Sequence, residues 1–198
     1  MYDADYFLRG LETGKSLYVD YHWLPELTIP MCNAIVKHFG IKGQSVLDFG
    51  CARGYTVKAL HQLGYDARGV DVSTWALDNC DPDVKDFVSS KLSFVDWIIA
   101  KDVLEHIPQV VETINDLLLH ARIGVFVVVP LSDMDNHPYV VSDYEKDVTH
   151  FHRLTLASWV RMFLRPGWSI EARYRILGVK DNYNDWTTGN GFITARRL

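Results

Sequence analysis

The sequence contains little cysteine, three residues in 198, at positions 32, 51 and 80. Their spacing fits no zinc-binding pattern and no CxxC redox motif, and an odd number of cysteines makes a poor disulfide framework. Residues 1–10 are acidic and aromatic, unlike a secretory signal peptide. Because reduced thiols are the ordinary state inside cells, we expect a cytoplasmic protein.

Long apolar runs and basic runs are also missing. No apolar run approaches the ~20 residues needed to span a bilayer, so no membrane partner is expected. The net charge is −5, the sequence pI is about 5.9, and the longest Lys/Arg run is Arg196-Arg197. Proteins that bind nucleic acid usually carry a basic stripe, so no nucleic-acid partner is expected either. With 48% apolar and 23% charged residues, the composition is typical of one globular domain.

Between residues 45 and 131, short apolar runs alternate with stretches of helical periodicity. Alternating strands and helices favour right-handed βαβ crossovers and a parallel sheet, so this pattern predicts an α/β fold. The expected strands cover 45–49, 67–71, 84–88, 97–100 and 123–129, and the expected helices between them cover 53–63, 73–80 and 110–118.

The strongest motif is the segment Val46-Leu47-Asp48-Phe49-Gly50-Cys51-Ala52-Arg53-Gly54. An apolar strand runs into a tight turn of small residues and then into a helix. Such a turn lets a ligand approach the backbone and the free N–H groups at the helix start. It is similar to a dinucleotide-binding fingerprint, but Ala52 breaks the strict GxGxxG pattern.

Two further elements follow in order. The second predicted strand ends in Asp71, 23 residues after Asp48. That spacing is near the ~20 residues expected for a carboxylate that binds ribose hydroxyls, and Val72 would then lie beside an adenine. A helix N-cap is the alternative role for Asp71. The fourth predicted strand ends in Ala100-Lys101-Asp102, and the carboxyl ends of parallel strands face the ligand crevice in open α/β sheets.

These elements, with Asp102-Val103-Leu104-Glu105-His106-Ile107 as the third, resemble the class I S-adenosylmethionine-dependent methyltransferases of the small-molecule type. The resemblance covers residues 45–131 well and the C-terminal strands more loosely. It implies S-adenosylmethionine as the cofactor and a Rossmann-like, seven-stranded, mostly parallel sheet with helices on both faces and an antiparallel last strand. It also implies cofactor contacts from Asp48, Gly50, Cys51, Ala52, Gly54, Asp71, Val72, Ala100, Lys101 and Asp102.

The two ends of the chain complete one predicted domain over residues 1–198. Residues 1–44 are expected to form an N-terminal helical cap, whose aromatic side chains either pack on the sheet or cover the cofactor. Residues 45–131 form the expected cofactor-binding core. Residues 132–198 form the acceptor side, with a loop over 132–154, a helix over 155–164, and strands over 168–179 and 191–195.

The acceptor-side loop contains Asp147-Val148-Thr149-His150-Phe151-His152, which resembles a D-x-T-H-x-H stretch of methyltransferases that act on sugars, lipoquinone precursors and related metabolites. His150 and His152 alternate, so both can face one side of an extended segment. Either imidazole can act as a general base near neutral pH, and His150 is the preferred candidate. The alternative is that both histidines only fix the loop through hydrogen bonds.

The same loop permits a metal site. Glu145, Asp147, His150 and His152 are four potential ligands within eight positions, and a His-x-His pair with carboxylates can hold a divalent ion. Charged loops are common without an ion, so the expectation is that no metal is bound.

The sequence therefore predicts a methyltransferase that acts on the hydroxyl or amine of a small-molecule acceptor, such as a sugar or glycan precursor. Two alternatives stay open: methylation of RNA or protein, and a non-catalytic subunit that binds S-adenosylmethionine. No NPPY- or DPPY-like segment follows the fourth predicted strand, which disfavours an amino-methylating DNA enzyme. The sequence leaves the oligomeric state open.

Overall fold

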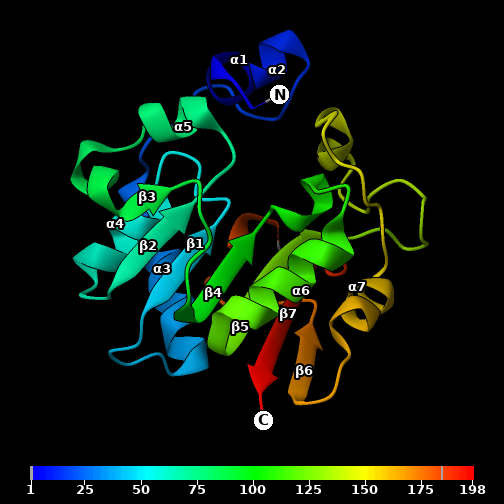
Figure 1. Ribbon diagram of the computed structural model, residues 1–198. Helices are drawn as coiled ribbons and strands as arrows, with labels where there is room; N and C mark the ends of the chain where they lie inside the picture. The colour runs from blue at the N-terminus through cyan, green and yellow to red at the C-terminus, as the bar shows by residue number, and fades with distance from the viewer. Residues whose placement is uncertain (1, 184) are drawn as a thin grey trace.

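The computed structural model describes residues 2–183 and 185–198. One sheet lies at its centre, and its seven strands run in the order β3-β2-β1-β4-β5-β7-β6 (Figure 1). The strands are β1 (Val46–Phe49), β2 (Ala67–Val70), β3 (Val88–Ser89), β4 (Val95–Lys101), β5 (Ala121–Pro130), β6 (Trp168–Arg173) and β7 (Asn190–Arg197).

The first five strands are parallel to their neighbours, whereas β7 is antiparallel to both β5 and β6. The predicted Rossmann-like sheet, seven-stranded and mostly parallel with an antiparallel last strand, is therefore confirmed. The carboxyl ends of the parallel strands meet at one edge, where α1, α2 and α5 lie in Figure 1.

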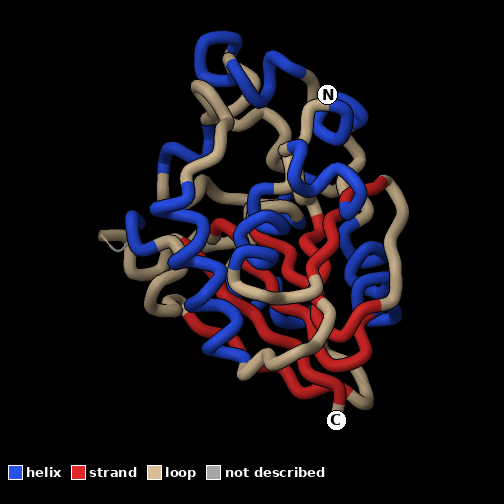
Figure 2. Tube along the Cα trace, turned by 90° about the vertical axis from the view of Figure 1, so that its left-hand side faces the viewer, coloured by secondary structure: helices blue, strands red, loops and turns tan. Residues whose placement is uncertain are grey.

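Helices cover both faces of the sheet, as Figure 2 shows from the side. The α-helices are α1 (Ala4–Leu8), α2 (Gly10–Thr13), α3 (Pro25–Phe39), α4 (Tyr55–Gln62), α5 (Thr74–Asp78), α6 (Val110–His120) and α7 (Leu156–Phe163). Short 3-10 helices are η1 (Pro82–Phe87), η2 (Leu104–His106), η3 (Ser142–Lys146) and η4 (Asp181–Tyr183).

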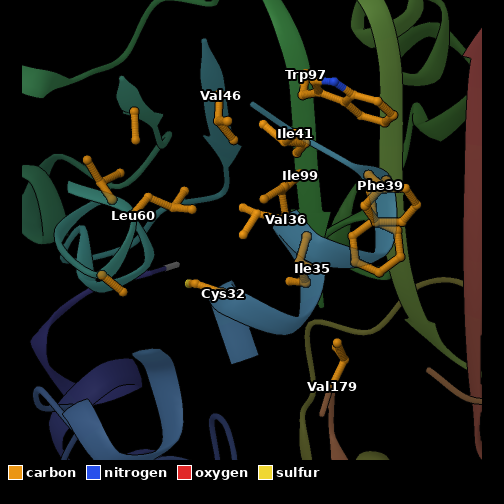
Figure 3. Packing of buried hydrophobic residues seen from close by; sticks show 14 of the residues in the cluster. Cys32, Ile35, Val36, Phe39, Ile41, Val46, Leu60, Trp97, Ile99 and Val179 are labelled. Carbon is orange, nitrogen blue, oxygen red and sulfur yellow. The ribbon is translucent and has the colours of Figure 1, made fainter. Parts of the chain in front are cut away.

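The side-chain alternation of β4 explains why the sheet needs two layers of helices. Trp97 and Ile99 point into a core formed with α3 and α4, whereas Ile98 and Ala100 point into a core formed with α6 and α7. All four side chains are buried, as expected for a parallel strand covered on both faces. In Figure 3 the α3 residues Ile35, Val36 and Phe39 lie against the sheet residues of the first core.

Two predicted strands differ in the structure. The segment predicted as a strand over 84–88 is mostly the 3-10 helix η1, because Asp81 caps it by accepting from the Asp83 amide and Pro82 favours its first turn; only Val88–Ser89 pair with β2. The strand predicted over 168–179 ends at Arg173, and the chain then turns through Gly178, whose φ is +86°.

None of the helices in the described residues is long and apolar enough to cross a membrane.

Candidate functional site

The turn after β1 has a backbone conformation that requires glycine at two positions. Gly50, Ala52 and Gly54 all have positive φ, at 79°, 47° and 79°. A Cβ at Gly50 would lie 2.3 Å from Cγ2 of Val103, and one at Gly54 would lie 2.6 Å from Cγ2 of Val84. Glycine is therefore required at both positions by packing as well as by φ. Ala52 adopts the left-handed conformation at a modest energetic cost.

The turn is tied to β2 by hydrogen bonds. The amides of Gly50 and Cys51 donate to the Val70 carbonyl at 2.8 and 3.0 Å. The amide of Ala52 donates to Oδ2 of Asp71 at 2.7 Å, and the amide of Ser73 donates to Oδ1 at 2.8 Å. Asp71 thus organises both the turn and the start of α5, and Ser73 is the residue that caps α5.

Asp71 keeps acceptor capacity for a ligand. A carboxylate has about four lone-pair directions, and the two backbone amides use two of them. Burial raises the pKa of Asp71, and the hydrogen bonds from Ser73 and Ala52 oppose that effect. The next side chain, Val72, is 81% exposed and offers an apolar surface directly beside the carboxylate. A carboxylate next to an open apolar surface suits a nucleoside.

Asp48 lies below the turn in β1 and is 5% exposed. Burial raises its pKa to about 7, even though the positive charge of Lys101 acts in the opposite direction. Cys51 is also buried, at 2% exposure. The side chains of Asp48 and Cys51 therefore present little surface to solvent at the turn.

At the end of β4, two ammonium groups flank one carboxylate. Asp102 pairs with Lys101 Nζ at 2.5 Å and with Lys180 Nζ at 2.7 Å. Burial alone would raise the pKa of Asp102, but the charges of Lys101 and Lys180 outweigh it and hold the pKa well below its usual range. The Lys180 ammonium also lies over the rings of Tyr144 and Tyr183, at 4.8 and 5.1 Å from their centroids.

At this edge of the sheet, the structure departs from the sequence-based expectation at two residues, Ala100 and Lys180. Ala100 is fully buried in the core formed with α6 and α7, so its side chain presents no surface to a ligand. Lys180 was not found by sequence reasoning, because it lies 78 residues after its partner in a connection without a motif. Its positive φ of 58° is a property that only the structure reveals.

The acceptor-side loop is held by a chain of polar contacts. Thr149 donates its hydroxyl to Oδ1 of Asp147 at 2.6 Å, and Nδ1 of His106 lies 2.7 Å from that hydroxyl oxygen. Tyr6, from the N-terminal segment, donates to Oδ2 of Asp147 at 2.8 Å. Asp147 and Thr149 are buried. The loop is thus connected both to the end of β4 and to α1.

The two candidate bases have different surroundings. His152 Nε2 lies 2.8 Å from the Ile107 carbonyl, so it donates a hydrogen bond that fixes the loop. His150 Nδ1 is buried and has no hydrogen-bond partner. The His150 ring lies 4.5 Å from the His106 ring, centroid to centroid. Burial lowers the pKa of His150 and lowers that of His106 to about 4.

Of the four potential metal ligands that the loop sequence permits, Glu145, Asp147 and His152 are engaged by other groups. Glu145 accepts from Arg153 at 2.9 Å and from the Tyr139 amide at 2.8 Å. Asp147 accepts from Tyr6 and Thr149, as described above. Among the described residues, the group of potential ligands that comes together is instead Glu105, His106 and His150, within 4.8 Å of one another. The set of ligands that the loop sequence permits is therefore not the set that the described residues bring together.

The N-terminal aromatic segment packs directly on the glycine turn. Tyr6 and Phe7 are buried against Ala52 and Ala76, and Phe7 stacks on Trp75 with centroids 5.5 Å apart. Backbone carbonyls of the segment also accept hydrogen bonds from the site, Tyr2 from Ser73 Oγ at 2.6 Å and Tyr21 from the Arg53 guanidinium at 3.0 Å.

Trp23 lies farther away, with its ring 5.8 Å from that of Tyr55 in α4. The segment therefore both packs on the fold and covers the turn.

Comparison with known proteins identifies the fold. The chain is similar in structure to an S-adenosylmethionine-dependent methyltransferase from Archaeoglobus fulgidus (TM-score 0.66, 15% identity, 88% of this chain and 95% of that chain). It is also similar to the plantazolicin methyltransferase BpumL in complex with SAH (TM-score 0.59, 16% identity, 87% and 83%). A third similar structure is the mitomycin 7-O-methyltransferase MmcR (TM-score 0.61, 13% identity, 87% and 54%). No curated protein matches the sequence.

A family model described as a methyltransferase domain matches residues 27–172. This range includes the glycine turn, Asp71, the end of β4 and the acceptor-side loop. The expected enzyme class and cofactor are thereby confirmed, whereas the residues that hold the cofactor and the nature of the acceptor belong to the proposals below. The chain belongs to the methyltransferase-domain family, as a class I methyltransferase whose cofactor is S-adenosylmethionine.

Proposed function

We propose that this enzyme methylates a hydroxyl or amine of a small-molecule acceptor, such as a sugar or glycan precursor. The observation that carries the cofactor half of this proposal is the Asp71 carboxylate, held by the Ala52 and Ser73 amides beside the exposed side chain of Val72. Two similar structures are methyltransferases named for the compounds plantazolicin and mitomycin. They support a small acceptor here.

Each cofactor-site residue has a separate task in this proposal. Asp71 accepts hydrogen bonds from the ribose hydroxyls, and Val72 packs beside the adenine. The backbone from Gly50 to Gly54, with Cys51 and Asp48 beneath it, lies along the methionine part. Lys101 and Asp102 line the same crevice at the end of β4, and Ala100 supports it from the core.

Methyl transfer needs an acceptor atom held in line with the S–CH₃ bond, and the bound cofactor supplies a good leaving group. Much of the catalysis is therefore positioning and exclusion of water. The buried rings of Tyr6 and Phe7 on the glycine turn suit that role. We accordingly propose residues 1–44 as the cap, 45–131 as the cofactor-binding core and 132–198 as the acceptor side. Since the three cysteines are free and buried, we keep the cytoplasm as the proposed location.

A hydroxyl acceptor must lose its proton as the new bond forms. We propose that His150 takes this proton when no metal ion is bound. Its Nδ1 has no hydrogen-bond partner, whereas His152 Nε2 already donates to the Ile107 carbonyl. The test compares His150→Gln with His152→Gln. If the turnover of saturated enzyme is unchanged in His150→Gln, the base role is ruled out.

The acceptor class is tested with a labelled methyl group. The enzyme, with S-adenosylmethionine carrying a labelled methyl, is incubated with a metabolite extract, an RNA fraction and a protein fraction. Label in the metabolite fraction supports the proposal, and label only in RNA or protein overturns it. Calorimetry with S-adenosylhomocysteine on the same preparation separates a non-catalytic binding subunit, which binds without transfer, from a protein that fails to bind.

A further inference from the structure

Three side chains, of which only His150 has a role in the proposed methyl transfer, converge at η2 and the acceptor-side loop. Glu105, His106 and His150 each offer one ligand atom, and these atoms lie within 4.8 Å of one another. Glu105 is 1% exposed, and its Oε2 has no hydrogen-bond partner. His150 Nδ1 is buried and unpartnered as well. Because a buried polar atom without a partner costs free energy, two such atoms in one cluster need an explanation.

The hydrogen bonds around His106 determine which of its nitrogens carries the lone pair. The Thr149 hydroxyl has one proton, and it donates that proton to Asp147 Oδ1 at 2.6 Å. The Thr149 oxygen must therefore accept from His106 Nδ1–H, 2.7 Å away. In neutral His106 the lone pair is then on Nε2, which lies 4.0 Å from Glu105 Oε1. In metal-binding histidines, one ring nitrogen typically binds the ion while the other donates a hydrogen bond that orients the ring, as Nδ1 of His106 does here to Thr149.

The backbone holds the two halves of the cluster together. The Glu105 carbonyl accepts hydrogen bonds from the amides of Phe151 at 2.8 Å and His152 at 3.3 Å. These amides directly follow His150 in the chain, so η2 and the loop cannot separate without breaking both bonds. The cluster is thus built on connected elements and does not depend on one mobile side chain.

We propose that Glu105, His106 and His150 form a binding site for one divalent first-row transition-metal ion. Two imidazoles and one carboxylate are a ligand set that such ions use with open positions for water or substrate. Ligands about 2.1 Å from one ion lie about 3.0–4.2 Å apart, so binding requires only a small contraction of the cluster. The site shares only His150 with the set that the loop sequence suggests.

The ion also has a role if the proposed function holds. An acceptor hydroxyl bound at an open position would lose its proton more readily, and His150 would then be a ligand instead of the base. This role rests on the proposed function, whereas ion binding itself does not. The test therefore measures ion binding alone, without cofactor or acceptor.

The experiment uses the full chain after treatment with EDTA, titrated with Co²⁺ and with Zn²⁺ by calorimetry, with the visible absorption of Co²⁺ as a second readout. We expect one ion per chain. Glu105→Gln and His150→Gln should each weaken binding at least about 10-fold, and Thr149→Val should weaken it about 10–100-fold by releasing His106. His152→Gln is the matched control and should bind the ion unchanged.

Uptake of less than one ion per chain at millimolar Co²⁺, or equal affinity of the wild type and Glu105→Gln, overturns the proposal. If Glu105→Gln does not fold, anomalous scattering from crystals of the Co²⁺-loaded wild type locates the ion, and an ion away from these three residues overturns it equally. Calorimetry with S-adenosylhomocysteine on the same protein reports on the cofactor site, so failure of the two proposals can be told apart.

Discussion

The Asp71 carboxylate accepts a hydrogen bond from the Ala52 backbone amide at 2.7 Å, and this contact joins the two cofactor motifs. An acid at this position is usually considered for its contact to ribose. Here it also holds the turn after β1, where Ala52 has a φ of 47°. The same side chain accepts from Ser73, so one carboxylate orders the turn and the start of α5 together.

We predict that Asp71→Asn weakens cofactor binding roughly 10–100-fold, because the loss of one charged acceptor at a buried site costs about 1–3 kcal/mol. The amide has one acceptor oxygen in place of two, so it cannot satisfy both backbone amides and the ribose. Calorimetry with S-adenosylhomocysteine measures the affinity. Asp66→Asn, an exposed position before β2, is the control. Equal affinities for the two variants would contradict the role given to Asp71.

The fold was predictable because its signals are local. The apolar runs of β4 and β5 are long and largely buried, β1 is short but also largely buried, and Gly50 and Gly54 mark the turn by residue type alone. The region around η1 was predicted wrongly because the cap at Asp81 and Pro82 outweighs the β-propensity of Val84 and Phe87.

The site was predictable only in part, because several contacts join distant segments. Lys180 on Asp102 and Tyr6 on Asp147 span 78 and 141 residues, and no pattern in the sequence connects them. The cluster around Glu105 was missed for the same reason, since His150 comes from another part of the chain. Motifs identify residues within one segment, whereas packing decides which segments meet.

Gly50→Ala should unfold more easily than the wild type and fail to bind the cofactor. The new methyl group meets Cγ2 of Val103 at 2.3 Å and also forces a positive φ on alanine. We expect a loss of about 2–5 kcal/mol in the free energy of unfolding, from overpacking and strain combined. Urea unfolding measures it. Gly43→Ala, with a φ of +66° and nothing within 4 Å, isolates the strain. Adding Val103→Ala to Gly50→Ala should recover part of the loss, and no recovery would show that the contact is unimportant.

Asp102→Asn should destabilise the protein more than Lys180→Met. Without the carboxylate, two ammonium groups face each other, and an unpaired charge that is largely buried costs about 3–5 kcal/mol. Lys180 has 7% side-chain exposure, but its removal leaves Asp102 paired with Lys101, so we expect a loss of about 1–2 kcal/mol. Lys146→Met breaks an exposed pair with Asp143 and should cost no more than about 1 kcal/mol. The reverse order in urea unfolding would contradict this account of the ion pairs.

Asp48 should make the ligand-free protein less stable as the pH rises. Its folded pKa of about 7 lies above its ordinary value of 3.8, so the folded state binds more protons between these values. The stabilisation from this proton is complete below pH ~4 and is lost as the pH rises through ~7, at up to about 1.4 kcal/mol per pH unit. Asp48→Asn removes the effect, so it should equal the wild type near pH 4 and exceed its stability at pH 8. Unfolding curves across this range check the prediction, and a difference that is constant with pH would refute it.

Trp75 should report cofactor binding by its fluorescence, because it stacks on Phe7 and lies four residues after Asp71. A nucleoside bound beside Asp71 and Val72 would change the surroundings of this indole. We expect S-adenosylhomocysteine to shift the fluorescence emission of the wild type but not that of Trp75→Phe. Trp168→Phe, which removes an indole from β6, is the control and should keep the shift. Trp23→Leu should keep the shift, since Trp23 packs on Tyr55.

Phe7→Ala should weaken cofactor binding by about 1 kcal/mol, or roughly 5-fold, if the N-terminal segment closes over the cofactor. Unchanged affinity in Phe7→Ala would mean that the segment only packs on the fold.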